Sequence, residues 1–148
     1  MFIGFTLKQI DKIPEGALRE ACTEAEKELA KRVKKDTEPY VPALTGEFSD
    51  NTRVVDNVII YESEKPMVRY LYQGKRMVNA ATGRGPYYIK DVGYRYPRGA
   101  KLKATSDPLH YTHDKHPLAT AHWMEMSSRD NIIKWNEYLA EVILRGLK

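Results

Sequence analysis

The sequence predicts an α+β fold in which an N-terminal and a C-terminal helix pack on one face of a small, mostly antiparallel sheet. Helical periodicity is confined to the two ends of the chain, short β-rich runs lie between them, and strands and helices do not alternate as in a parallel sheet. A chain of 148 residues has the usual size of one domain, and we expect residues 1–148 to form a single domain.

The first long helix is expected from Pro14 to about Asp36, after a loosely alternating strand at residues 2–7. Its acidic residues come first and its basic residues last, which suits both ends of the helix dipole. A repeat every three to four residues predicts the face that packs on the core: Leu18, Cys22, Ala25, Leu29 and Val33. Cys22 is the only cysteine, and we interpret it as a small core residue.

Shorter elements follow this helix. Pro39 and Pro42 should end it, because the residue before a proline is disfavoured in the helical conformation. Two β-rich runs, Thr52–Val55 and Val58–Glu62, flank the turn-forming pair Asp56-Asn57. They predict a hairpin.

The centre of the chain is less regular. Lys65–Tyr72 is expected to be a short helix, because Pro66 suits a first turn. From Gln73 to Pro117, glycine, proline and paired aromatic residues recur without a sustained helical period, which predicts a long loop or extended arm. Within it, residues 87–89 and 91–94 can supply a small hairpin.

The C-terminal part predicts helical structure again. One helix is expected over Ala119–Met126 and a second, or a continuation of the first, over Asp130–Leu147, with Ser128 or Asp130 as the cap. An apolar stripe should anchor it against the first long helix: Ile132, Trp135, Leu139, Val142 and Ile143.

Positive charge and tyrosine are concentrated in the middle of the chain. Ten basic residues and one acidic residue, Asp91, lie between Lys65 and Lys103, although the whole chain has a formal net charge of only +4. Bases interleaved with tyrosines suit nucleic-acid binding and are equally common at protein interfaces; solvated surface charge is the third interpretation. The candidate interface or DNA-facing residues are Arg69, Lys75, Arg76, Arg84, Arg95, Arg98, Lys101, Lys103, Tyr87, Tyr88, Tyr94 and Tyr96.

Possible metal ligands also lie close together in the sequence: Asp107, His110, His113, Asp114, His116 and His122. Their spacing matches no established closed site, so histidines that titrate near neutral pH are the simpler interpretation and a metal-dependent hydrolase is the alternative. The run at 82–86 lacks the flanking strand and the Lys-Ser/Thr pair of a phosphate-binding loop. We predict no enzyme, no catalytic residue, no cofactor and no bound metal.

Four blocks occur in a distinctive order: Tyr-Val-Pro-Ala-Leu-Thr-Gly-Glu-Phe at 40–48, Val-Ile-Ile-Tyr-Glu at 58–62, Val-Arg-Tyr-Leu-Tyr-Gln-Gly-Lys at 68–75, and Pro-Leu-Ala at 117–119 before Trp123. This order resembles the minor capsid proteins of tailed bacteriophages, which are related to head-tail joining and tail-completion proteins. The resemblance covers roughly residues 12–148.

The resemblance implies a structural virion protein of the head-tail connector, a neck or tail-completion ring that joins the tail to the head and lets DNA pass. Its partners would be copies of itself, with a hexamer favoured over a dodecamer, and adjacent neck, portal-side and tail-tube proteins. It would lie in the virion, and in the host cytoplasm during assembly, without membrane association.

The residues that match the family pattern are expected to shape the fold: Tyr40, Pro42, Thr45, Gly46, Tyr70, Tyr72 and Gly74. The alternative function is a nucleic-acid-binding module that uses the basic, tyrosine-rich segment 65–103.

Overall fold

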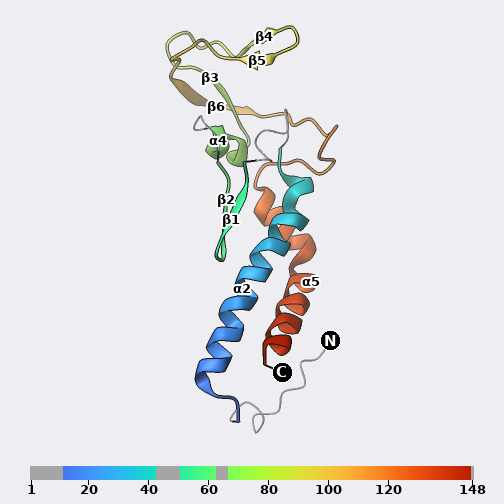
Figure 1. Cartoon of the computed structure of the whole chain (residues 1–148). Helices are drawn as coiled ribbons and strands as arrows, with labels where there is room; N and C mark the ends of the chain where they lie inside the picture. Colours follow the sequence, from blue (N-terminus) through green and yellow to red (C-terminus); the bar gives the residue numbers. More distant parts are fainter. Residues whose placement is uncertain (1–11, 43–50, 63–66, 148) are drawn as a thin grey trace.

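The computed structural model describes residues 12–42, 51–62 and 67–147. Two long helices, α2 (Glu15–Thr37) and α5 (Trp123–Gly146), lie side by side, and a short 3-10 helix, η1 (Glu38–Tyr40), continues α2 (Figure 1). The fold has the predicted α+β class. The predicted strand at 2–7 and the expected turn at Thr45-Gly46 lie outside the described residues.

Helix α2 confirms the predicted N-terminal helix, and the Pro14 carbonyl accepts its first hydrogen bond, from Leu18 N at 3.1 Å. The predicted core stripe was mostly wrong, because Leu18, Cys22, Leu29 and Val33 are only partly buried. The buried residues are small: Ala21, Ala25, Ala30 and Thr37. Ala21 lies against Gly146 and Thr37 against Ser127 of the second long helix, and small side chains allow the two backbones to approach.

Helix α5 is one continuous helix, so the predicted start at Ala119 was wrong and the continuation was right. Its N-cap is His122 in the left-handed conformation, with φ 51°, and neither Ser128 nor Asp130 caps a helix because both lie inside this one. The buried face repeats every four residues, at Trp123, Ser127, Asn131 and Trp135. Ile132, predicted to be in the core, is 44% exposed.

Polar side chains join the two long helices. Thr37 Oγ1 and Ser127 Oγ, both fully buried, lie 2.8 Å apart in a hydrogen bond. Trp135 Nε1 donates to Asp36 Oδ2 at 2.9 Å. A pair held by such side-chain bonds has a fixed register, because sliding by one turn would leave the buried hydroxyls unpaired.

The predicted hairpin after α2 is confirmed. Strands β1 (Arg53–Val55) and β2 (Val58–Ile60) pair antiparallel with Val55 opposite Val58, and Asp56 takes a positive φ of 53° in the two-residue turn. The hairpin lies against α2, where Asn57 Nδ2 donates to Glu26 Oε2 at 3.0 Å.

An aromatic cluster closes the end of the helix pair. Its buried members are Tyr40, Val41 and Trp123, and helix α4 (Met67–Gln73) contributes partly buried Val68, Leu71 and Tyr72. The Tyr72 and Trp123 rings meet edge to face, with centroids 4.7 Å apart. The two motifs around Tyr40 and Tyr72 therefore meet in the core. We call α2, η1, β1, β2, α4 and α5 together the body.

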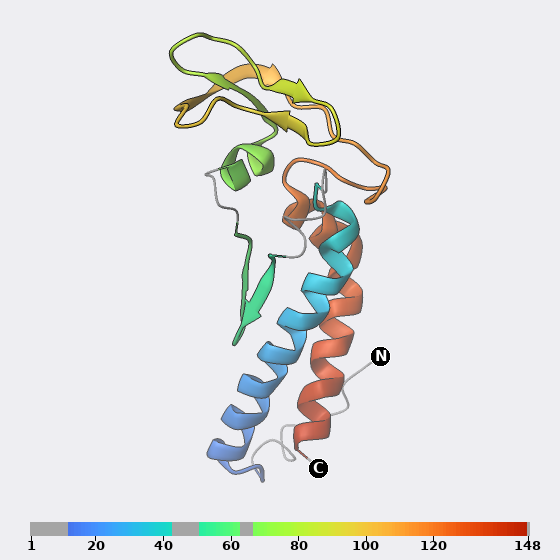
Figure 2. The ribbon, with the colours of Figure 1, turned by 45° about the horizontal axis from the view of Figure 1, so that its top comes forward.

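Residues 73–117, predicted to be a long loop or an extended arm, contain four strands. Strand β3 (Lys75–Asn79) pairs with β6 (Leu102–Pro108), and β4 (Tyr87–Ile89) pairs with β5 (Gly93–Arg95), both antiparallel. The small hairpin predicted inside the loop is thereby confirmed. We call residues 75–108 the β-arm. It extends from the body beyond α4, at the end of the helix pair opposite the start of α2 (Figures 1 and 2).

The expected single sheet is three separate two-stranded sheets among the described residues. Among the described helices, none is long and apolar enough to cross a membrane.

Candidate interaction surface

The β-arm is attached to the body by close backbone contacts. Gly74 has a positive φ of 71°, and a Cβ at this position would lie 2.8 Å from Ala121 Cβ, so only glycine fits without movement. Gly74 O accepts a hydrogen bond from Leu109 N at 2.9 Å, and Tyr111 OH donates to Leu71 O at 2.5 Å. Both ends of the arm are thus tied to α4 and its neighbours.

The stem of the arm, β3 with β6, has a small interior of its own. Met77 and Val78 are buried, and Tyr96 from beyond the tip donates its hydroxyl to Met77 O at 3.0 Å. Burial raises the pKa of Tyr96 above its ordinary value. The segment after β5 therefore packs on the stem, and Tyr96 has a structural role there.

The β4–β5 hairpin, residues 87–95, forms the tip of the arm. Tyr88 lies opposite Tyr94, and their rings meet edge to face with centroids 5.3 Å apart. Asp91 supports the turn with a positive φ of 65°. The exposed large side chains of the tip and its turn are Tyr87, Tyr88, Ile89, Val92 and Tyr94, and Tyr88 is the most exposed at 65%.

The tip is a two-stranded sheet that leaves most of its large side chains exposed. An isolated two-stranded hairpin is only marginally stable in water, and clustered exposed apolar side chains mark interaction sites. The tip therefore has the character of a contact surface.

The predicted basic residues are exposed as well. Lys75, Arg76, Arg84, Arg95, Arg98, Lys101 and Lys103 lie on the β-arm, whereas Arg69 lies on α4. In the described part of the chain, none of these eight bases has a carboxylate oxygen within 4.0 Å. Their charge is thus available to an acidic partner.

Three of the residues considered as possible metal ligands have other partners. His116 Nδ1 donates to Val41 O at 2.6 Å and His113 Nε2 to Ala119 O at 3.0 Å, while His122 stacks edge to face with Tyr72. Across residues 12–42, 51–62 and 67–147, no group of three His, Cys, Asp or Glu side chains could hold a metal ion. The His116 bond holds the segment before α5 against Val41 at the end of η1, and the His113 bond lies within that segment.

Residues 82–86 belong to the turn that ends β3. Asn79 N donates to Arg84 O at 2.7 Å, and Gly83 N donates back to Asn79 O at 2.8 Å. The local backbone amides are therefore used inside the turn. Gly83 has a positive φ of 69°. The turn conformation alone therefore accounts for a glycine at this position, and no phosphate ligand is needed to explain it.

Sequence reasoning missed the stem of the arm. Strands β3 and β6 are more than 20 residues apart, and a bulge between Lys75 and Met77 interrupts their register. The usable signal was the alternation of apolar and polar residues over Leu102–Thr105, although Lys103 and Ala104 are poor strand formers. Comparisons with family models, curated proteins and solved structures found no match to this chain.

Proposed function

We propose that the protein is a structural component of the head-tail connector of a tailed phage, a neck or tail-completion ring through which DNA passes. The order of sequence blocks described above supports this proposal. Tyr40 and Tyr72, from two of those blocks, meet around Trp123, as expected of residues that shape the fold.

The observation that carries the proposal is the tip of the β-arm. An arm with exposed tyrosines and unpaired bases, held away from the helix pair, suits contact with a neighbouring subunit or an adjacent ring (Figure 2). Contacts between unlike surfaces close into a ring when the rotation between copies divides a full turn. A hexamer remains favoured over a dodecamer, and nearby neck, portal-side and tail-tube proteins remain the proposed neighbours.

The test is electron microscopy of intact phage particles, combined with mass spectrometry of their protein content. We expect this chain as a ring between the portal and the tail tube. A phage in which a two-residue turn replaces residues 87–95 should produce unjoined heads and tails. Absence of the chain from the particle would refute the proposal.

A second candidate function is nucleic-acid binding by the β-arm. The arm contains eight basic and two acidic residues. Its exposed tyrosine rings can stack on the nucleobases of a single strand. Neutralising Arg95, Arg98, Lys101 and Lys103 should then weaken binding to a single-stranded oligonucleotide and reduce the salt dependence of the binding constant. Equal binding before and after the substitutions would exclude this function.

A further inference from the structure

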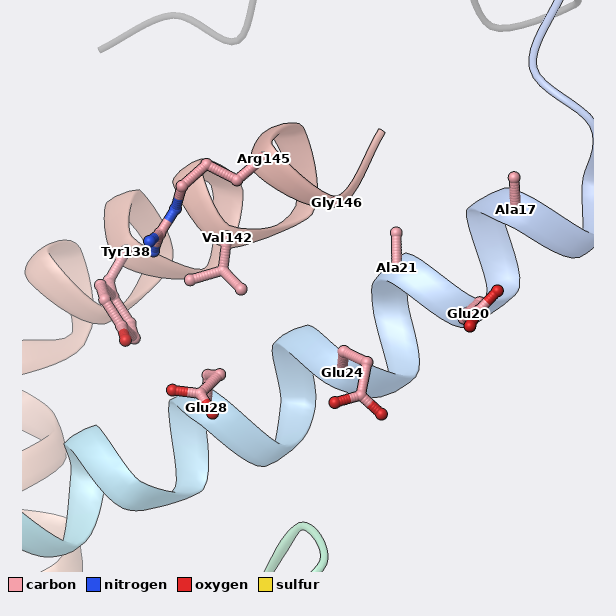
Figure 3. A pocket seen from close by; sticks show the side chains of 9 residues that line it. All are labelled: Ala17, Glu20, Ala21, Glu24, Glu28, Tyr138, Val142, Arg145 and Gly146. Carbon is pink, nitrogen blue, oxygen red and sulfur yellow. The ribbon is translucent and has the colours of Figure 1, made fainter. Parts of the chain in front are cut away.

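The helix pair has an open groove at the end far from the β-arm. Figure 3 shows it between the first half of α2 and the last turns of α5, and it encloses about 490 Å³. Its apolar side chains include Ala17, Ala21 and Val142, and Tyr138 closes one end. A groove of this size can receive one or two side chains of a partner.

Acidic side chains line the same groove. Glu20, Glu24 and Glu28 come from successive turns of α2, against the single cation Arg145 from α5 (Figure 3). Glu24 and Glu28 each pair with an exposed lysine at 2.9 Å, and Glu20 has no cation within 4.0 Å among the described residues. The apolar side chains together with Glu20, the lining carboxylate without a salt bridge among the described residues, suit an occupant that has both an apolar side chain and a cation.

The tip of the β-arm has this composition. Tyr88 and Tyr94 present exposed rings, and Lys90 and Arg95 present exposed cations beside the single acid Asp91. Tyrosine and arginine are the side chains most often found at the energetic centre of interfaces. Charge complementarity therefore matches the tip to the groove, whereas a nucleic acid would be repelled from the groove.

The two surfaces cannot meet within one molecule. The tip lies at one end of the chain's fold and the groove at the other, in both ribbon views (Figures 1 and 2). Resting on the proposed function, we propose that the tip of one copy docks in the α2–α5 groove of a second copy. The contact joins unlike surfaces, so it propagates from copy to copy and closes into a ring when the rotation permits.

A charge exchange tests this docking. The groove variant carries Glu20→Lys and Glu24→Lys, and the tip variant carries Lys90→Glu and Arg95→Glu. Each variant alone should self-associate at least tenfold more weakly than the wild type, because like charges then meet. An equimolar mixture should recover association, since every contact between unlike variants again joins opposite charges. Sedimentation velocity at low salt measures all three samples.

Two controls make the result specific. Glu141→Lys changes an exposed charge on α5 outside the groove and should leave association unchanged. For a direct contact, Glu20→Cys and Asp91→Cys are placed in separate chains that also carry Cys22→Ala. Only the mixture of the two chains should form a dimer with a short thiol cross-linker.

Several results would overturn the docking. The docking is wrong if the groove variant associates as strongly as the wild type, or if mixing the two variants restores no association. It is also wrong if the mixed cysteine chains give no cross-linked dimer, or if the wild-type chain is monomeric at millimolar concentration. If only the tip variant loses association, the arm binds another surface and the proposed function survives. If the chain is missing from phage particles while the charge exchange succeeds, the docking stands and the proposed function fails.

Discussion

The body buries its large aromatic side chains, whereas the β-arm exposes most of its own. In the body, Trp123 is 1% exposed and sits between the rings of Tyr61 and Tyr72. In the β-arm, Tyr88 is 65% exposed and contacts mainly its cross-strand neighbour. The difference shows that the body buries its large side chains in its own contacts, whereas the tip leaves them exposed, and we propose that a partner covers them.

The largest effect should come from removing the central ring of the body. Trp123→Ala should lower the free energy of unfolding by about 3–5 kcal/mol, the range for truncating a fully buried aromatic side chain. Urea denaturation measures it, with Tyr88→Ala as the matched aromatic truncation in the arm. Equal losses for the two variants would remove the contrast between body and arm.

The junction between body and arm should be the next most sensitive position. Gly74→Ala should destabilise the fold by about 2–4 kcal/mol, because the left-handed conformation and the contact with Ala121 both oppose a Cβ. Gly83→Ala is the matched control: its φ is also positive, at 69°, but no atom lies within 4 Å of the new Cβ. Thermal unfolding should show a clearly smaller loss for Gly83→Ala, and equal losses would show that the contact is unimportant.

The buried hydroxyl pair of the body gives an intermediate effect. Thr37→Val leaves the Ser127 hydroxyl without this partner and should cost about 1–3 kcal/mol. The double variant with Ser127→Ala should cost less than the sum of the two single changes, because each single change already removes the bond between the two hydroxyls. Strict additivity in a double-mutant cycle would contradict the pairing.

Alkaline pH should weaken the body through its buried tyrosines. Burial raises the pKa of Tyr61 from 10.0 to about 12. The folded state therefore holds the phenolic proton more tightly than the unfolded state, and this stabilisation is complete below pH 10 and is lost as the pH rises towards 12. Tyr61→Phe should show a shallower fall in the free energy of unfolding over that range, and an identical slope would contradict the role of this burial.

The smallest effect on stability should come from the tip. Replacing Tyr88 and Tyr94 by serine should change the free energy of unfolding by no more than about 0.5 kcal/mol per site, as for other exposed positions. The same variant should lose self-association, measured by sedimentation velocity. A large loss of stability would show that the tip is completed within the chain.

The sequence predicted those elements whose signals are local. Helical periodicity predicted both long helices, and the turn-forming pair Asp56-Asn57 predicted the first hairpin. Periodicity placed Ala25 correctly but did not predict that Ala21, Ala30 and Thr37 are buried while Leu18 and Leu29 are only partly buried, because burial depends on what packs against each position. The bond from His116 to Val41 joins residues 75 positions apart and has no local signal.

The candidate site was predictable in composition but not in shape. Charge and tyrosine content located the exposed residues of the arm, since a base surrounded by few acids is exposed in most folds. The stem that carries them depends on long-range pairing of β3 with β6, and so the sequence predicted a loop or extended arm without this stem.

Amide hydrogen exchange, measured in the isolated chain and in the assembled oligomer, tests the contrast between body and arm most directly. In the isolated chain, amides of α2 and α5 should be strongly protected and those of the β4–β5 tip should exchange fast. Assembly should protect the tip and the groove that receives it, in the first half of α2 and the last turns of α5, and leave the rest of the helix pair unchanged. A tip that is already protected in the isolated chain, or that gains no protection on assembly, would contradict a partner-completed arm.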